Sequence, residues 1–464
     1  MISVAAPRRV WRAGAVLAAG VAAAAGGYAL ARAATRFEDL APLVMVLAVA
    51  LPVAAVAVVA DPRIGVLLVF LVFPIGFTPL PGVPLDLVQG TIIGVSALVL
   101  VSRIRMAESA PRMSPVYWWV VALLAWTLLG TPSAVDVDLA VRRLPSTAAQ
   151  LLFGVAIVTI CRRRDDLRVV AFGLVAIVAA VGLTTLGGAS QVRTDFGGAV
   201  VSGRATAMFS EPNQLGSFSA IGALVGAGLA LSLRSRGRRL LVGALTVLAV
   251  LALLLSLSRG AWLGFGLGML VLLVQVPRAR RALAVTTVAL FVVALTYGAL
   301  RPQSPEVHVV GERFRSFTGE QNPYDDRPTI WAEARREIRV DPLTGHGLGN
   351  FPLVARRSTS KSHTSFPPHA HNLLLNWGAE TGVPGVALIL GFAGHLGVAT
   401  RRAFRRMRAE GRMHDAALLA GLAGAALAVF GQGLVDYTLW STVVFTQVWA
   451  VLGLLVAAVE LERR

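Results

Sequence analysis

The sequence predicts an all-α integral membrane protein, a helical bundle with about 12 to 14 transmembrane helices. Of its 464 residues, 56% are hydrophobic and only 15% are charged, whereas soluble domains carry roughly 25% charged residues. Apolar segments long enough to cross a bilayer recur along the whole chain. Too little polar sequence remains to cover soluble domains, so the composition excludes a soluble globular protein, a disordered chain and a coiled coil.

Fourteen apolar segments are candidate spans. They cover residues 13–31, 41–60, 64–80, 83–101, 116–130, 146–161, 169–186, 214–233, 240–257, 260–276, 282–300, 383–399, 416–435 and 438–459. Several are shorter than the roughly 20 residues of a straight span, and 116–130 and 146–161 are the weakest. The first segment follows three arginines as in a signal peptide, but its length favours an uncleaved helix.

The arginines are distributed unequally between the two sides of the predicted bundle. If the N-terminus is cytoplasmic, the inside segments hold 26 arginines and the short outside loops hold 7. Cytoplasmic loops of membrane proteins carry such an excess. We therefore expect a multi-pass protein with both termini in the cytoplasm. The net charge of +18 is explained by these clusters and does not indicate a nucleic-acid partner.

Three regions follow from this pattern: N-terminal spans over 1–300, a long polar outer loop over 301–371, and C-terminal spans over 372–464. Loops of this length usually carry function, and this one contains the pattern of short helices. We expect it to supply part of the active site. The single cysteine, Cys161, excludes an internal disulfide and a cysteine metal cluster, and we expect it to be a packing residue.

Arginines at the predicted outer face are candidate anion binders. Arg259 lies in a very short turn between two apolar segments, where it either serves a site or snorkels to the membrane surface beside Trp262. Arg204 precedes the span 214–233, and Glu211 either pairs with it or lines a cavity with it. Both interpretations are open for each arginine.

Arg327 begins a predicted helix with Pro328 at the first position. Free backbone amides and the helix dipole favour an anion there, and a guanidinium adds donors that match a phosphate. Asp325 and Asp326 are the competing anions for this positive end. Trp331 follows one turn later, within stacking distance of Arg327.

The densest polar cluster is His-Ala-His-Asn at 369–372, which opens an apolar segment with Glu380 further along. A neutral imidazole of His369 or His371 takes a proton from a hydroxyl near neutral pH. Zinc is the rival, because His346 and His363 share the same loop. Their spacing matches no standard zinc pattern, so we expect no metal. Asp436, at the last outer turn, is either a further site group or a helix cap.

These groups suit a substrate with a phosphate head. The arginines would stabilise the leaving charge and a histidine would activate an acceptor hydroxyl. Such a substrate outside the cytoplasm arrives in the membrane, so a lipid-linked pyrophosphate sugar is the natural candidate. The glycine-rich segment 345–351 lacks the Gly-Lys-Ser/Thr of a nucleotide loop and is expected to be a tight turn.

The chain resembles the O-antigen ligase and O-antigen polymerase family of bacterial envelope enzymes over about 200–436. The resemblance rests on the Ser-Arg-Gly-Ala-Trp turn ending at Trp262, the segment 327–331, the glycine-rich segment 345–351, and His-Ala-His-Asn followed by Glu380 and Gly385. It implies a metal-independent glycosyltransferase without a cofactor. Its donor would be a glycan on a polyprenyl pyrophosphate such as undecaprenyl pyrophosphate, and its acceptor a glycan, lipid or protein.

The resemblance also implies a location and residue roles. The active site would face outward from the cytoplasmic (inner) membrane, in cell-surface polysaccharide biosynthesis. Arg259 and Arg327 would bind the pyrophosphate and His371 would be the base. Our physical interpretation adds six substrate-binding candidates: Arg204, Glu211, His369, Asn372, Trp331 and Glu380. Ligase and polymerase are not distinguished by these residues.

Two other functions are weighed against this one. A transporter or exporter of an anionic or lipid-linked glycan would also use many spans and a basic outer cavity. It should show charged groups near the bilayer midplane and two matching halves. We find no paired halves, and Asp86, in the fourth candidate span, is the one feature that favours it. A scaffold protein, in which the outer cluster is incidental, ranks below both.

Overall fold

The computed structural model describes residues 54–75, 86–105, 114–186, 191–196, 199–277, 279–281, 327–355 and 368–463. Within them, seven helices are long and apolar enough to cross a membrane, and four shorter helices are also apolar. The predicted all-α membrane fold is confirmed. The candidate spans 13–31 and 282–300, and most of 41–60, lie outside the described residues, so the total number of spans stays a prediction.

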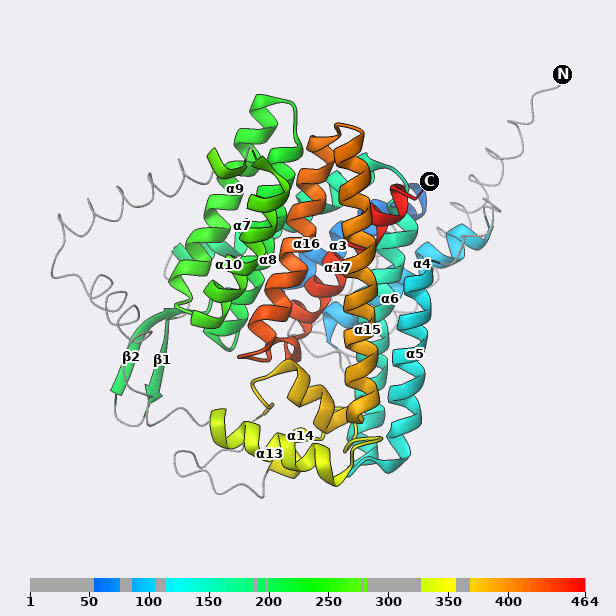
Figure 1. Ribbon diagram of the computed structural model, residues 1–464, viewed down its shortest axis with the longest axis vertical. Coiled ribbons are helices and arrows are strands. Elements are labelled where there is room, and N and C mark those ends of the chain that lie inside the picture. The colour runs from blue at the N-terminus through cyan, green and yellow to red at the C-terminus, as the bar shows by residue number, and fades with distance from the viewer. Residues whose placement is uncertain are drawn as a thin grey trace, which may run out of the picture.

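Figure 1 shows the helices packed side by side, with a smaller layer across one end. The helices are α3 (Pro62–Val72), α4 (Leu87–Arg105), α5 (Pro115–Gly130), α6 (Val137–Ile160), α7 (Arg164–Leu186), α8 (Pro212–Ser232), α9 (Arg236–Leu255), α10 (Arg259–Gln275), α13 (Arg327–Val340), α14 (Phe351–Val354), α15 (Leu373–Ala409), α16 (Met413–Gly433) and α17 (Thr442–Leu461). One antiparallel pair of strands, β1 (Gln191–Phe196) and β2 (Ala199–Ala205), was not predicted.

Two helices depart most from the predicted spans. The span 383–399 is the middle of α15, a 37-residue element that is kinked at Gly382, where φ is +71°. The span 146–161 is the second part of α6, which begins nine residues earlier because the Asp136 carboxylate caps it by accepting a hydrogen bond from the backbone N–H of Leu139. Hydropathy does not predict such extensions, because the added turns of these helices are polar.

Glycines bring α16 into close contact with its two main neighbours. A methyl group at Gly228 of α8 would stand 2.7 Å from the Cα atom of Gly421, and one at Gly268 of α10 would stand 2.5 Å from the carbonyl oxygen of Gly424. Helices in membranes associate through such small-residue contacts because lipid is as apolar as their side chains. These close contacts pack α16 against both α8 and α10, which also contact each other.

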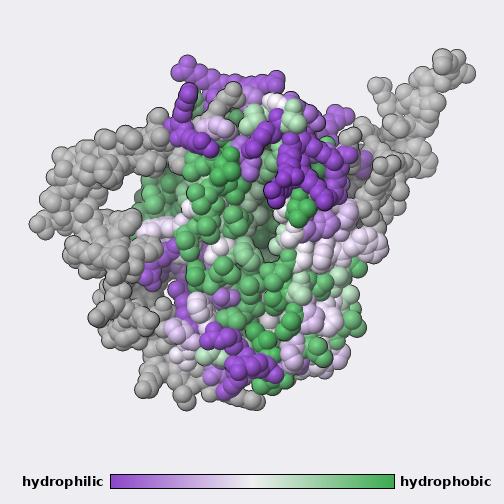
Figure 2. All heavy atoms as spheres, viewed as in Figure 1, coloured by the Kyte–Doolittle hydropathy of each residue, from purple (hydrophilic) through white to green (hydrophobic). Residues whose placement is uncertain are grey.

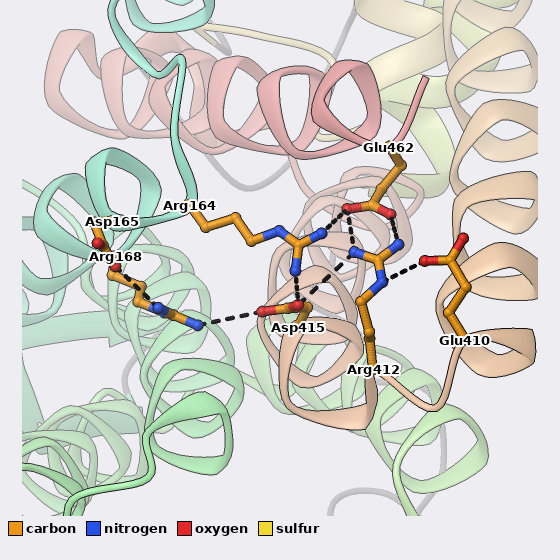
Figure 3. Close-up of polar contacts among 7 residues, drawn as sticks. All are labelled: Arg164, Asp165, Arg168, Glu410, Arg412, Asp415 and Glu462. Atoms are coloured by element: carbon orange, nitrogen blue, oxygen red, sulfur yellow. Dashed lines mark hydrogen bonds and ion pairs between the residues drawn. The ribbon is translucent and has the colours of Figure 1, made fainter. Parts of the chain in front are cut away.

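An ion-pair network joins three helices at one end of the bundle, which we call the Arg164 end (Figure 3). Asp415, at the start of α16, binds Arg164 and Arg168 of α7. Glu462, after α17, has a side chain only 3% exposed and binds both Arg164 and Arg412. The network therefore ties α7, α16 and α17 together.

The opposite end, which we call the site end, is covered by the described part of the predicted outer loop. There α13 and α14 lie across the helix ends (Figure 1), and the segment 345–351 forms the predicted tight turn, with positive φ at Gly345, Gly347 and Gly349. The N–H groups of His346 and Gly347 donate to the carbonyls of Ala379 and Glu380, each over 2.9 Å. Figure 2 shows hydrophilic residues gathered at both ends and apolar residues between them.

Candidate active site

The loop before α15 holds the two predicted histidines. Asn372 caps the helix: its Oδ1 accepts from the N–H of Leu375 over 3.0 Å, and its Nδ2 donates to the carbonyl of Leu434 over 2.7 Å. His371 has φ of +47°, in the left-handed region that non-glycine residues rarely adopt. Such strain is characteristic of functional loops. Asn372 thus fixes this loop to the end of α16, and we assign it a positioning role.

His371 is paired with Asp436, the residue that the sequence left open. The Nδ1 atom of His371 lies 2.9 Å from Oδ1 of Asp436, whose side chain is 4% exposed. Burial raises the pKa of Asp436, but the hydrogen bond and charge of His371 and the charge of Arg327 outweigh it and lower that pKa to about 2. An ionised, buried carboxylate therefore holds the imidazole.

His369 lies behind His371 in an aromatic pocket. Its ring centroid is 4.3 Å from that of His371, 5.7 Å from Tyr437 and 5.6 Å from Trp440. Burial lowers the pKa of His369 to about 3, so its ring is neutral. Its Nδ1 accepts a hydrogen bond from the backbone N–H of His371 over 3.3 Å. Its buried Nε2 has no hydrogen-bond partner among the described atoms. Trp440 was not anticipated, because nothing in an apolar segment distinguishes it from a packing residue.

Glu211 lies within the electrostatic field of the same cluster. Burial, and then the negative charge of Asp436, raise the pKa of Glu211, while His371, Arg204 and Arg327 act in the opposite direction. Mutual effects of this kind require proximity. The structure therefore brings together five charged or titratable groups from the loop before α8, from β2, from α13, from the loop before α15 and from the end of α16.

Arg204 ends β2 in a buried position. Its Nε donates to the carbonyl of Ser256 over 3.1 Å, and one terminal nitrogen donates to Oδ1 of Asn213 over 2.9 Å. The first bond joins the hairpin to the turn between α9 and α10, and the second joins it to the start of α8. Arg204 therefore has a structural task in addition to its charge at the cluster.

Arg259 is the first residue of α10 and is half-buried. Ser258 caps this helix, accepting from the N–H of Ala261. A methyl group at Gly260 would stand 3.2 Å from Val435, immediately before Asp436. The backbone of Arg259 is thus placed beside the end of α16 that presents Asp436.

Glu380 makes its hydrogen bonds outside this cluster. Glu380 is buried in α15 and accepts hydrogen bonds from the N–H groups of Gly349 and Phe351 and from Asn376. It therefore fastens the glycine turn. Trp331 follows Arg327 on α13, and its buried indole N–H has no hydrogen-bond partner within the described chain.

The cluster also has the spacing of a metal site. His369, His371 and Asp436 each offer one ligand atom, and these atoms lie within 4.8 Å of one another. Two nitrogens and one carboxylate oxygen suit a transition metal. Two of these atoms are already paired with each other, and the positive charge of Arg327 acts on His369 and Asp436. The positive charge of Arg327 disfavours a bound cation at these three residues. Measuring transfer with and without EDTA tests directly whether a metal is required.

Residues 244–390 match the family model described as O-antigen ligase. The chain carries an O-antigen ligase domain. The predicted resemblance to the O-antigen ligase and polymerase family is thereby confirmed. Together with its membrane helices, the O-antigen ligase domain indicates a multi-pass membrane enzyme that processes glycans. No curated protein matches the chain.

The O-antigen ligase domain contains the predicted residues Arg259, Arg327 and His371. Arg204 and Glu211 precede it and Asp436 follows it. The cluster around His371 is therefore completed by residues outside the matched segment. The mutual packing of α8, α10 and α16 places Glu211 and Asp436 near the matched segment, and no motif within 244–390 indicates this.

Proposed function

We propose that this protein is a glycosyltransferase that moves a glycan from a polyprenyl pyrophosphate to an acceptor hydroxyl at the outer face of the cytoplasmic membrane. The observation that carries the proposal is the buried His371–Asp436 pair within the field of Arg204 and Arg327. A base and an anion-binding group in one cluster are what displacement of a pyrophosphate requires.

His371 acts as the base in this proposal. Its Nδ1 carries the proton that faces Asp436, so Nε2 keeps a lone pair for the acceptor. The acceptor O–H gives its proton to Nε2, and its oxygen forms a bond to the anomeric carbon. The bond from that carbon to the pyrophosphate oxygen breaks, and the electron pair leaves with the pyrophosphate. Direct displacement inverts the anomeric configuration, which NMR of the product linkage checks.

The arginines stabilise the charge that develops on the leaving group. Arg327 is the first residue of α13, where backbone N–H groups and the helix dipole add to its positive charge. Arg259 is the first residue of α10, so backbone N–H groups and a helix dipole add to its positive charge in the same way. Charge-assisted, partly desolvated contacts of this kind strengthen as the bond breaks, so their loss should reduce transfer more than folding.

The distribution of basic residues supports an outer location for the site end. Most arginines of the predicted inside segments belong to the Arg164 end, around the start of α7, the start of α9 and the end of α15. The positive-inside rule assigns that end to the cytoplasm. Both termini would then be cytoplasmic.

The position of Asp86 no longer favours a transporter. Asp86 does not lie within a span: it precedes α4, and its carboxylate accepts from the N–H of Gln89 while its own N–H donates to the Gln89 side chain. This reciprocal arrangement is a capping box. The charge of Asp86 is therefore used to start a helix.

The test uses the purified native chain in detergent with a glycan-loaded undecaprenyl pyrophosphate and an acceptor. Release of undecaprenyl pyrophosphate and growth of the acceptor are measured with and without EDTA. We expect transfer in both conditions, and the product's size separates polymerase from ligase. Loss of transfer with EDTA, restored by one metal, would show that the three-residue set is a metal site. With the chain reconstituted into vesicles, movement of intact glycolipid across the bilayer without donor consumption would indicate a transporter instead.

A further inference from the structure

An apolar cavity begins beside the candidate base and runs along the helices. Its volume is about 570 Å³, within the range of ligand pockets. It lies between α15 and α16, with α5, α10 and α17 completing its walls, and Figure 2 shows a hollow in the apolar face of the molecule. Leu373, two residues after His371, and Leu439, next to Trp440, line the end nearest the site.

The lining changes character along the cavity. Of the described residues that line it, only Gln275, Thr400 and Arg401 are polar, and all three belong to the Arg164 end. The remainder are aliphatic, aromatic or glycine. Beyond the kink at Gly382, the lining residues of α15 run from Leu388 to Phe404, a separation of 16 residues or about 24 Å of helix. The cavity is therefore long as well as apolar, and it covers most of the hydrocarbon thickness of a bilayer, roughly 30 Å.

We propose that this cavity holds the polyprenyl chain of the donor and selects donors with long chains. The proposal rests on the proposed function, because that function supplies a lipid pyrophosphate beside His371. A lipid whose head group is at the cluster must direct its chain away from it, and the near end of the cavity is lined by Leu373 and Leu439, close in sequence to His371 and Asp436. Its opening along the apolar face lets the chain enter from the bilayer without crossing water.

Such a cavity distinguishes donors by the length of their polyprenyl chain. A farnesyl chain held by its pyrophosphate at the site end fills only the part near Leu373 and Trp377. An undecaprenyl chain extends past the kink at Gly382 to the region of Gly397. Because lipid surrounds the protein, the gain comes from packing against the walls, and the expected preference is moderate.

Two glycines of α15 provide a matched pair of variants. A side chain at Gly397 would enter open space in the cavity, and one at Gly394 would also meet nothing within 4 Å but lies outside the cavity lining. Gly397→Phe therefore places a ring in the far part of the cavity from a position with room for its Cβ, and Gly394→Phe makes the same change on the same helix elsewhere. Ala426→Phe blocks the opposite wall from α16.

The experiment measures binding of undecaprenyl pyrophosphate and farnesyl pyrophosphate to the purified native chain and to the three variants. We expect Gly397→Phe and Ala426→Phe to bind undecaprenyl pyrophosphate about tenfold more weakly and farnesyl pyrophosphate as the native chain does. Gly394→Phe should match the native chain with both ligands. Equal binding of both ligands by all four proteins would overturn the proposal, and so would release of a copurified phospholipid by Gly397→Phe without a change in prenyl binding.

Transfer assays separate this proposal from the proposed function. If the native chain shows the chain-length preference but transfers no glycan, the cavity assignment stands and the enzymatic proposal fails. If it transfers glycan and Gly397→Phe has native KM for the long-chain donor, the enzymatic proposal stands and the cavity assignment fails.

Discussion

The imidazole of His371, before α15, is held by the carboxylate of Asp436, after α16, across 2.9 Å and 65 positions of sequence. The orientation of the candidate base is therefore set by a helix that packs from a different part of the chain. A second hydrogen bond, from the N–H of Tyr437 over 2.8 Å, keeps the carboxylate in place. The pair depends on how α16 ends.

Asp436→Asn should lower kcat about 100-fold with little change in donor KM. The amide cannot hold the same imidazole tautomer or stabilise its positive charge, while the arginines remain. Initial rates over a range of donor concentrations and pH values check this, because a positioning role should also change the pH–rate profile. Asp138→Asn, an exposed residue paired with Arg142, is the control. A native kcat and profile in Asp436→Asn would contradict the assignment.

Arg327→Lys should lower kcat/KM for the donor about tenfold and Arg327→Ala should lower it further. A lysine keeps the charge but loses the planar fork that matches a pyrophosphate. Arg335→Lys, an exposed change on the same helix, should behave as the native chain. Initial rates over a range of donor concentrations measure all three variants, and equal kcat/KM values for the Arg327 and Arg335 variants would remove Arg327 from the site.

The stability of the protein should fall in acid through His369. The folded-state pKa of about 3 lies below the usual 6.5. The folded state therefore binds fewer protons than the unfolded state, so this contribution is complete above pH 6.5 and is lost as the pH falls toward 3. The loss should not exceed about 1.4 kcal/mol per pH unit.

His369→Gln should reduce this pH dependence. The Tm values of the native chain and the variant are compared at each pH. Glu211 contributes to the pH dependence of stability in the opposite direction, but both proteins contain it, so its contribution cancels in the difference. His414→Gln, at the Arg164 end, is the control. Parallel curves for the native chain and His369→Gln would show that His369 is not kept neutral by burial.

Glu462→Gln should lower stability without affecting transfer. The buried carboxylate of Glu462 binds Arg164 and Arg412 (Figure 3). An amide in its place carries no negative charge to balance the two guanidinium groups. Because Arg164 is partly exposed, we expect only about 1 kcal/mol, a shift of a few degrees in Tm. Glu410→Gln, whose side chain is 58% exposed, should have a smaller effect. A large loss of transfer in Glu462→Gln at native Tm would indicate coupling between the two ends.

Hydropathy predicted the membrane class and most helix centres because apolar length is a direct requirement of the bilayer. It did not predict how far α15 extends, because the basic turn around Arg406 is compatible with a helix that leaves the membrane. It placed Asp86 inside a span because a capping residue next to an apolar run has no hydropathy signature. The hairpin was missed because its residues show no clean alternation.

The candidate site was proposed from the sequence where local motifs carry the chemistry, and its roles stay predictions. His371 stands out beside a helix cap, and Arg327 beside a proline that starts a helix. Glu380 was assigned to the substrate because it follows the histidines in sequence, yet the glycine turn occupies its carboxylate. The partnership of His371 with Asp436 depends on tertiary packing of α16, which a single sequence does not encode in any spacing.

The most direct test of the central claim is a single-turnover transfer assay with His371→Ala and a matched change, His395→Ala, in the membrane segment of α15. Equal amounts of folded protein receive glycan-loaded undecaprenyl pyrophosphate and acceptor. If His371 is the base, His371→Ala should transfer at least about 100-fold more slowly, and His395→Ala should transfer at the native rate. Native transfer by His371→Ala would contradict the account.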